Sequence, residues 1–126
     1  MNEFVAFAPG VHLLADFYGA CQLDDTNLLE ATLRTAAKAA NASVLSSHFH
    51  QFGGGGGVTG VVILAESHIS IHTWPERGFA AVDVFMCGNA DPEGAIQVLT
   101  QTLTPKRVET KRIERGYSNH LVQPSR

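Results

Sequence analysis

Two short runs of β-forming residues stand almost back to back in the middle of the chain, and they restrict the possible folds more than any other feature. They cover Val58–Leu64 and Ser67–Trp74, and only Ala65 and Glu66 separate them, without an obvious turn sequence. Both runs are rich in β-branched residues and have the length of strands rather than of helices. The middle of the chain is therefore expected to belong to a β-sheet.

Further strands and two helices are expected on either side of this pair. Residues typical of strands also predict strands over His12–Tyr18, Ser43–Phe52, Phe79–Met86 and Arg107–Glu114. Apolar residues at helical spacing predict helices over Leu28–Ala40 and Glu93–Leu103. Candidate N-caps of the first helix are Asp24, Asp25 and Thr26. Gly53–Gly57 is expected to form a loop, and Gly88–Pro92 a turn that starts the second helix.

This succession of elements predicts an α/β (α+β) fold, a two-layer sandwich in which a mainly antiparallel sheet packs both helices on one face. The other face of the sheet then needs a cover, and a second copy of the chain is the simplest one. We therefore expect the sheet to be completed at a homodimer interface. With 126 residues and no internal repeat or linker, the chain (1–126) is expected to be a single domain.

Composition and charge restrict the partners and the compartment. A net charge of -3 provides no basic surface for nucleic acid or anionic lipid. No apolar run reaches membrane-spanning length, and the start of the chain, with Glu3, does not resemble a signal peptide. The two cysteines, Cys21 and Cys87, are expected to remain free thiols. A cytoplasmic protein without nucleic-acid or membrane partners is expected.

Two other candidate binding features are weak. His48 and His50 share one face of a predicted strand, but no third ligand follows at a useful spacing, so we expect no metal site. The run Gly53–Gly57 lacks the strand-to-helix setting and the Lys-Ser/Thr pair of a phosphate-binding loop. It is expected to be a mobile loop at the rim of a site.

The segment Glu66–Glu76 carries the most specific pattern. A serine, Ser67, directly follows a glutamate inside an apolar strand, His72 comes five residues later, and Cys87 follows fifteen residues after that histidine. Together with other segments in the same order, this pattern resembles the prokaryotic S-adenosylmethionine decarboxylase proenzymes over roughly residues 10 to 115. The matching segments are Gly10–Leu13, Asp16–Tyr18, Phe49–Phe52, Thr59–Val62, Glu66–Glu76 and Ala80–Asp83.

The resemblance implies an enzyme that makes its own cofactor. The chain would cut itself at the Glu66–Ser67 bond into a β chain (1–66) and an α chain (67–126), and Ser67 would become a pyruvoyl group that binds the substrate as a Schiff base. The resemblance assigns self-processing to His72 and proton donation after decarboxylation to Cys87. Thr59 stands where the family usually has a serine that assists the acyl shift.

The resemblance also implies the substrate. Phe52 matches an aromatic residue that stacks on adenine, and Glu76 an acidic residue that binds the ribose hydroxyls. S-adenosylmethionine is therefore the expected substrate, and its product would supply aminopropyl groups for spermidine. One segment departs from the family, because Gly53–Gly57 replaces a Leu-Pro-Tyr-Gly type segment. Relatives use the same chemistry on arginine or ornithine, and these remain alternatives.

Strand geometry raises a separate question about Ser67 and His72. Side chains alternate along a strand, so His72 shares a face with His68, Ser70 and Trp74, whereas Ser67 points to the other face. Either the backbone bends at the cleavage point, or His72 serves the Ser67 of a symmetry-related chain. The second arrangement agrees with the uncovered sheet face and with the family, and we expect it.

Non-catalytic roles are also open. His72 could be a core or interface histidine, and Cys87 a small buried apolar residue. The whole chain could then be an uncleaved, non-catalytic homologue. The joint presence of Glu66, Ser67, His72 and Cys87 favours the enzyme.

Overall fold

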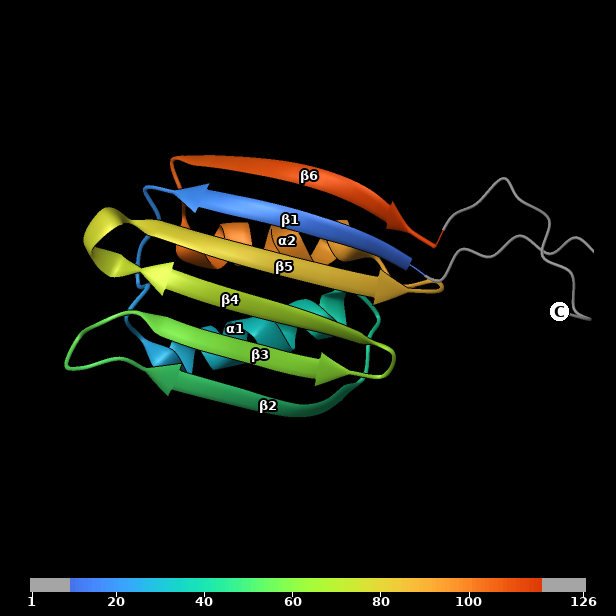
Figure 1. Ribbon diagram of the computed structural model, residues 1–126, viewed down its shortest axis with the longest axis horizontal. Helices are drawn as coiled ribbons and strands as arrows, with labels where there is room; N and C mark the ends of the chain where they lie inside the picture. Colours follow the sequence, from blue (N-terminus) through green and yellow to red (C-terminus); the bar gives the residue numbers. More distant parts are fainter. Residues whose placement is uncertain (1–9, 117–126) are drawn as a thin grey trace, which may run out of the picture.

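The computed structural model describes residues 10–116, which form a six-stranded sheet with two helices behind one face (Figure 1). The elements in chain order are β1 (Gly10–Tyr18), α1 (Thr26–Ala39), β2 (Val44–Gln51), β3 (Val58–Leu64), β4 (Ser67–Trp74), a 3-10 turn η1 (Pro75–Arg77), β5 (Phe79–Cys87), α2 (Pro92–Leu103) and β6 (Arg107–Arg115). This α+β sandwich confirms the predicted fold class, and the predicted bounds of the elements differ from the observed ones by at most two residues. The expectation about a signal peptide concerns residues outside the described range.

All strand pairs of the sheet are antiparallel, in the order β2-β3-β4-β5-β1-β6. The first strand, β1, therefore lies between β5 and β6, far from its sequence neighbour β2. In the β3–β4 hairpin, Thr59 lies opposite His72, and Leu64 lies opposite Ser67. This register determines which side chains lie together across the sheet.

The core lies between the sheet and the helices. Along β4, Ile69 and Ile71 are fully buried. They belong to the same hydrophobic cluster as Leu29 and Leu33 of α1, which are equally buried. Burying one such side chain stabilises the fold by about 1.5–3 kcal/mol. Asp25 caps α1, since its carboxylate accepts a hydrogen bond from the backbone N–H of Leu28 at 3.0 Å. The alternating pattern of the strands thus selects the face that the helices cover.

The turn between β3 and β4 is a local feature that the sequence did not predict. The sequence between β3 and β4 shows no obvious turn, yet Ala65 and Glu66 form a tight two-residue turn there. Glu66 adopts a φ of 64°, in the left-handed region that glycine or asparagine usually occupies. Because glutamate gives no signal for this conformation, the turn could not be identified from residue types.

The sheet face opposite the helices is open in the single chain. It carries partly exposed apolar side chains on three strands, namely Ile63 (39%), Trp74 (41%) and Ile113 (43%). The rings of His12 and His68 pack on each other and on Phe85, with centroid separations of about 6 Å. This face therefore mixes apolar and titratable groups that are only partly in contact with water.

Thr73, at the end of β4, offers a test of how the sheet is fixed at one end. Its buried hydroxyl donates a hydrogen bond to the Leu23 carbonyl at 2.7 Å and accepts one from the Val58 N–H at 2.8 Å. Thr73→Val keeps the size of the side chain but leaves both backbone groups unpaired, at about 1–3 kcal/mol each. The free energy of unfolding, measured by chemical denaturation, is expected to fall by about 2–6 kcal/mol.

Thr32 supplies the matched control, because both threonines are 5% exposed. The Thr32 hydroxyl bonds only the Leu28 carbonyl, one turn earlier in α1, and this carbonyl keeps its helical N–H partner when the hydroxyl is removed. Thr32→Val is therefore expected to lower the free energy of unfolding by no more than about 1 kcal/mol. Equal losses in the two variants would contradict the role assigned to Thr73.

His68 makes a prediction about pH. Burial lowers its pKa from 6.5, the nearby His12 lowers this pKa further, and Asp83 acts in the opposite direction. As the pH falls through 6.5, the unfolded chain binds a proton at this position before the folded chain does, so folding stability decreases with acidification. His68→Asn should reduce this decrease, as measured by chemical denaturation at pH values above and below 6.5.

Proton NMR gives an independent measurement of the same effect. His68 should titrate below 6.5 in the folded protein. Asp83→Asn removes the carboxylate that favours the imidazolium ion and should lower the His68 pKa further. A His68 pKa above 6.5, or one that rises in Asp83→Asn, would show that this assignment of causes is wrong.

Candidate active site

The bond between Glu66 and Ser67 lies in the strained turn that joins β3 and β4. A non-glycine residue in the left-handed region costs on the order of 1–3 kcal/mol, and the φ of 64° at Glu66 places it there. The surrounding structure holds the turn in place, since the Ala65 N–H donates a hydrogen bond to the Ser43 carbonyl at 3.1 Å. Backbone strain is therefore located directly before Ser67.

Cys87 contacts the carbonyl group of this same bond. Its thiol donates a hydrogen bond to the Glu66 carbonyl oxygen, with 2.9 Å between sulfur and oxygen. Cys87 reaches this position because it ends β5, the strand that pairs with β4. Ser67 and Cys87 also line one cavity of about 440 Å³. Its other lining residues are Asn41, Ala42, Ser43, Ala65, Asn89 and Ala90. Three of the predicted residues, Glu66, Ser67 and Cys87, therefore lie together.

A second cluster forms around His72. The Thr59 hydroxyl and the His72 Nδ1 atom share a hydrogen bond of 3.1 Å, which follows from their opposed positions in the β3–β4 hairpin. Both residues line a cavity of about 270 Å³ together with Phe52 and Glu76. Its remaining lining residues are Gly57, Val58, Thr73 and Trp74. The structure thus also brings together Thr59, His72, Phe52 and Glu76.

The segments at this end of the sheet explain how Phe52 and Glu76 reach the cavity. The chain turns back after β2 through Gly53–Gly57, and the Phe52 N–H donates a hydrogen bond to the Gly57 carbonyl at 2.8 Å. Glu76 lies in the 3-10 turn η1, which Gly78 ends in the left-handed conformation with a φ of 60°. Each side chain is therefore placed by a short backbone turn next to a strand end.

Trp74 is a residue of this cavity that the sequence analysis left without a site role. It is 41% exposed and lines the cavity beside Phe52 and Glu76. The signal was available, since Trp74 lies two residues after His72 and therefore on the same strand face.

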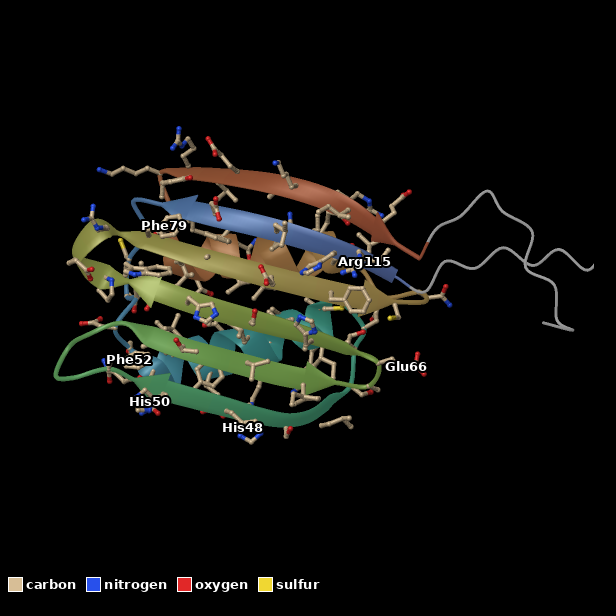
Figure 2. All side chains as sticks on the ribbon, viewed as in Figure 1. His48, His50, Phe52, Glu66, Phe79 and Arg115 are labelled. Carbon is tan, nitrogen blue, oxygen red and sulfur yellow. The ribbon has the colours of Figure 1, made fainter. Side chains whose placement is uncertain are left out.

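The two clusters lie at opposite ends of the sheet. Figure 2 shows Phe52 at one end and Glu66 at the other. Ser67 and His72 are five residues apart on the continuous strand β4, which corresponds to roughly 16 Å at about 3.3 Å per residue. His72 points to the open face, whereas Ser67 has the alternation of the buried Ile69 and Ile71. A single chain therefore does not bring Ser67 and His72 together, and the turn at Glu66 does not change this.

Other site types find little support in the part of the chain that the structure describes. Between residues 10 and 116, no three His, Cys, Asp or Glu side chains are arranged to hold a metal ion. His48 and His50 are both exposed on the edge strand β2. Neither described helix is long and apolar enough to cross a membrane. Cys21 and Cys87 are free thiols, as predicted.

Comparisons with known proteins identify the family of the chain. The sequence profile of the S-adenosylmethionine decarboxylase family matches residues 11–116. The S-adenosylmethionine decarboxylase proenzyme of Sulfurihydrogenibium sp. is 51% identical over 110 residues, which cover 85% of this chain and 82% of that protein. The proenzyme of Aquifex aeolicus is 48% identical over 112 residues, covering 85% and 81%.

A solved structure supports the same assignment. The crystal structure of the adenosylmethionine decarboxylase from Aquifex aeolicus VF5 has a TM-score of 0.77 and 41% sequence identity, and the match covers 92% of this chain and 98% of that chain. Sequence and structure therefore agree over nearly the whole length of the described residues. The chain belongs to the S-adenosylmethionine decarboxylase family, whose members are lyases.

Proposed function

We propose that this chain is a pyruvoyl-dependent decarboxylase that cuts itself between Glu66 and Ser67 and then decarboxylates S-adenosylmethionine. Cleavage would divide the single domain into residues 1–66 and 67–126. The observation that carries the proposal is the state of the Glu66–Ser67 bond, which lies in a strained turn with its carbonyl oxygen hydrogen bonded to Cys87. Membership of a family whose relatives are named proenzymes supports it.

The geometry suits an N-to-O acyl shift. The Ser67 hydroxyl attacks the Glu66 carbonyl carbon, an ester forms to the serine oxygen, and the peptide C–N bond breaks. Negative charge develops on the Glu66 oxygen during the attack, and the Cys87 thiol already donates a hydrogen bond to this atom. Release of the left-handed conformation at Glu66 favours the step further.

The ester then undergoes β-elimination. A base removes the Cα proton of residue 67, the Glu66 carboxylate leaves, and the resulting dehydroalanine is hydrolysed to the pyruvoyl group with loss of ammonia. The position of residue 67 fits this group, because it faces a cavity that the Cys87 thiol also lines. The pyruvoyl group supplies a carbonyl that condenses with the substrate's amino group and withdraws electrons as CO₂ leaves. Cys87 is then placed to return a proton to the carbon that lost CO₂.

The second cluster has the groups to bind a nucleoside. Phe52 is 56% exposed and can stack on a purine ring, a contact that contributes about 1–3 kcal/mol in base–aromatic pairs. The Glu76 carboxylate can accept hydrogen bonds from two ribose hydroxyls. Arginine or ornithine is the alternative substrate, because the same carboxylate could bind their cationic ends. Decarboxylated S-adenosylmethionine would supply aminopropyl groups for spermidine.

A two-fold dimer completes the site. Each chain carries Ser67 and Cys87 at one end of its sheet, and Thr59 and His72 at the other. A two-fold arrangement that places unlike ends together forms two complete sites with one interface. The open sheet face offers partly exposed apolar side chains for this contact, including Ile63 and Ile113. We therefore propose that His72 acts on the Ser67 of the other subunit.

The first test combines the mass of the protein with its activity. Purified protein should consist of a fragment that ends at Glu66 and a second fragment that begins with a pyruvoyl group at position 67. It should release CO₂ from S-adenosylmethionine with a radiolabelled carboxyl group, and Ser67→Ala should stay intact and inactive. An intact wild-type chain would contradict self-cleavage. Release only from labelled arginine or ornithine would contradict the proposed substrate and leave the mechanism in place.

The second test addresses the shared site. Ser67→Ala and His72→Ala should each fail to process normally when expressed alone. In a co-expressed mixture, heterodimers contain one site with both residues intact, so partial cleavage of the His72→Ala chain is expected. Tagged chains would establish that heterodimers form. Heterodimers without any cleavage would show that His72 does not act across the interface.

A further inference from the structure

The Phe52 ring lacks support from the segment that follows it. The backbone of Phe52 is held, since its N–H bonds the Gly57 carbonyl and its own carbonyl packs against Gly56. The Phe52 side chain is not held in this way by the loop. Gly53, Gly54 and Gly55 have no side chains, and nothing lies within 4 Å of the position that a Cβ would occupy on any of them. The glycine loop therefore provides no wall for the ring.

His50 provides a contact that the loop does not. It lies two residues before Phe52 near the end of β2, and the two ring centroids are 4.5 Å apart with the ring planes at 70°. This edge-to-face geometry is a favourable one for aromatic pairs. Figure 2 shows His50 beside Phe52 at the same end of the sheet.

The register of the sheet connects His50 to the rest of the second cluster. His50 lies opposite Thr59, and Thr59 lies opposite His72, so the three side chains form a row across β2, β3 and β4. The same three residues line a cavity of about 380 Å³ that adjoins the one containing Phe52 and Glu76. His50 therefore contacts the Phe52 ring and also lies in the row that contains Thr59 and His72.

We propose that His50 is a positioning residue that holds the Phe52 ring in the orientation needed to stack on the substrate. This inference rests on the proposed function, and it concerns a residue of the edge strand that makes no described contact with Ser67 or Cys87. Loss of the His50 ring leaves Phe52 free to adopt other rotamers, which weakens substrate binding. The described hydrogen bond of this row joins Thr59 to His72 and does not involve His50, so the chemical step and self-cleavage are expected to be unchanged.

Kinetics of His50 variants test the proposal. His50→Ala should raise KM for S-adenosylmethionine about three- to tenfold with kcat and self-cleavage unchanged, a range typical of the loss of one aromatic pair. His50→Phe keeps an aromatic edge against Phe52 and should restore most of the affinity. His48→Ala is the matched control, because His48 is an exposed histidine that lies opposite Val61 and lines the same cavity of about 380 Å³, but the described ring contact with Phe52 is made by His50. It should leave KM unchanged.

A double-mutant cycle separates positioning from a general structural effect. In a Phe52→Ala background, His50→Ala should raise KM no further, because the ring that it positions is gone. An unchanged KM in His50→Ala, equal losses in His50→Ala and His50→Phe, or full additivity with Phe52→Ala would each overturn the proposal.

The outcome can be distinguished from failure of the proposed function. A wild-type protein that releases no CO₂ from S-adenosylmethionine would contradict the function itself. In that case the contact is measured directly by proton NMR, through the nuclear Overhauser effect between the His50 and Phe52 rings. The positioning role would be supported if this effect is present in the wild type and if the Phe52 ring becomes less ordered in His50→Ala. Absence of the effect would overturn the proposal.

Discussion

The register of the β3–β4 hairpin is the constraint on which the rest of the candidate site depends. It places Thr59 beside His72 at one end, and it closes at Leu64 and Ser67 so that Glu66 must turn sharply at the other. A slip by one residue would exchange the buried and open faces of β4 and would expose Ile69 and Ile71. The buried isoleucines therefore fix the chemistry as well as the fold, because the same alternation assigns His72 to the open face.

The strained turn is stable only because ordinary packing surrounds it. Glu66 lies between two strands whose core residues are fully buried, and the Ala65 N–H and the Glu66 carbonyl both have hydrogen-bond partners. A cost on the order of 1–3 kcal/mol at one residue is small beside the burial of several large apolar side chains. The fold can therefore hold one peptide bond in an unfavourable conformation and still remain folded.

Sequence patterns predicted the layers and nearly all of the elements, because period-two and helical spacing report directly on burial. They also predicted that Ser67 and His72 face opposite sides of β4. The turn at Ala65-Glu66 was missed, since neither residue favours a positive φ. The contact between Cys87 and the Glu66 carbonyl could not be predicted from the sequence either, because it depends on the pairing of β5 with β4. The sequence shows Trp74 and His50, but it does not show that His50 lies opposite Thr59 or that Trp74 lines a cavity with Phe52.

The position of β1 has a consequence for the chain after a cut at Glu66. Residues before the cut contribute β1, α1, β2 and β3, and residues after it contribute β4, β5, α2 and β6. Because β1 is inserted between β5 and β6, each fragment completes the sheet of the other. The nicked protein would then be a complex of two interleaved peptides, without a covalent link. Its unfolding would become a dissociation, and its melting temperature would depend on protein concentration.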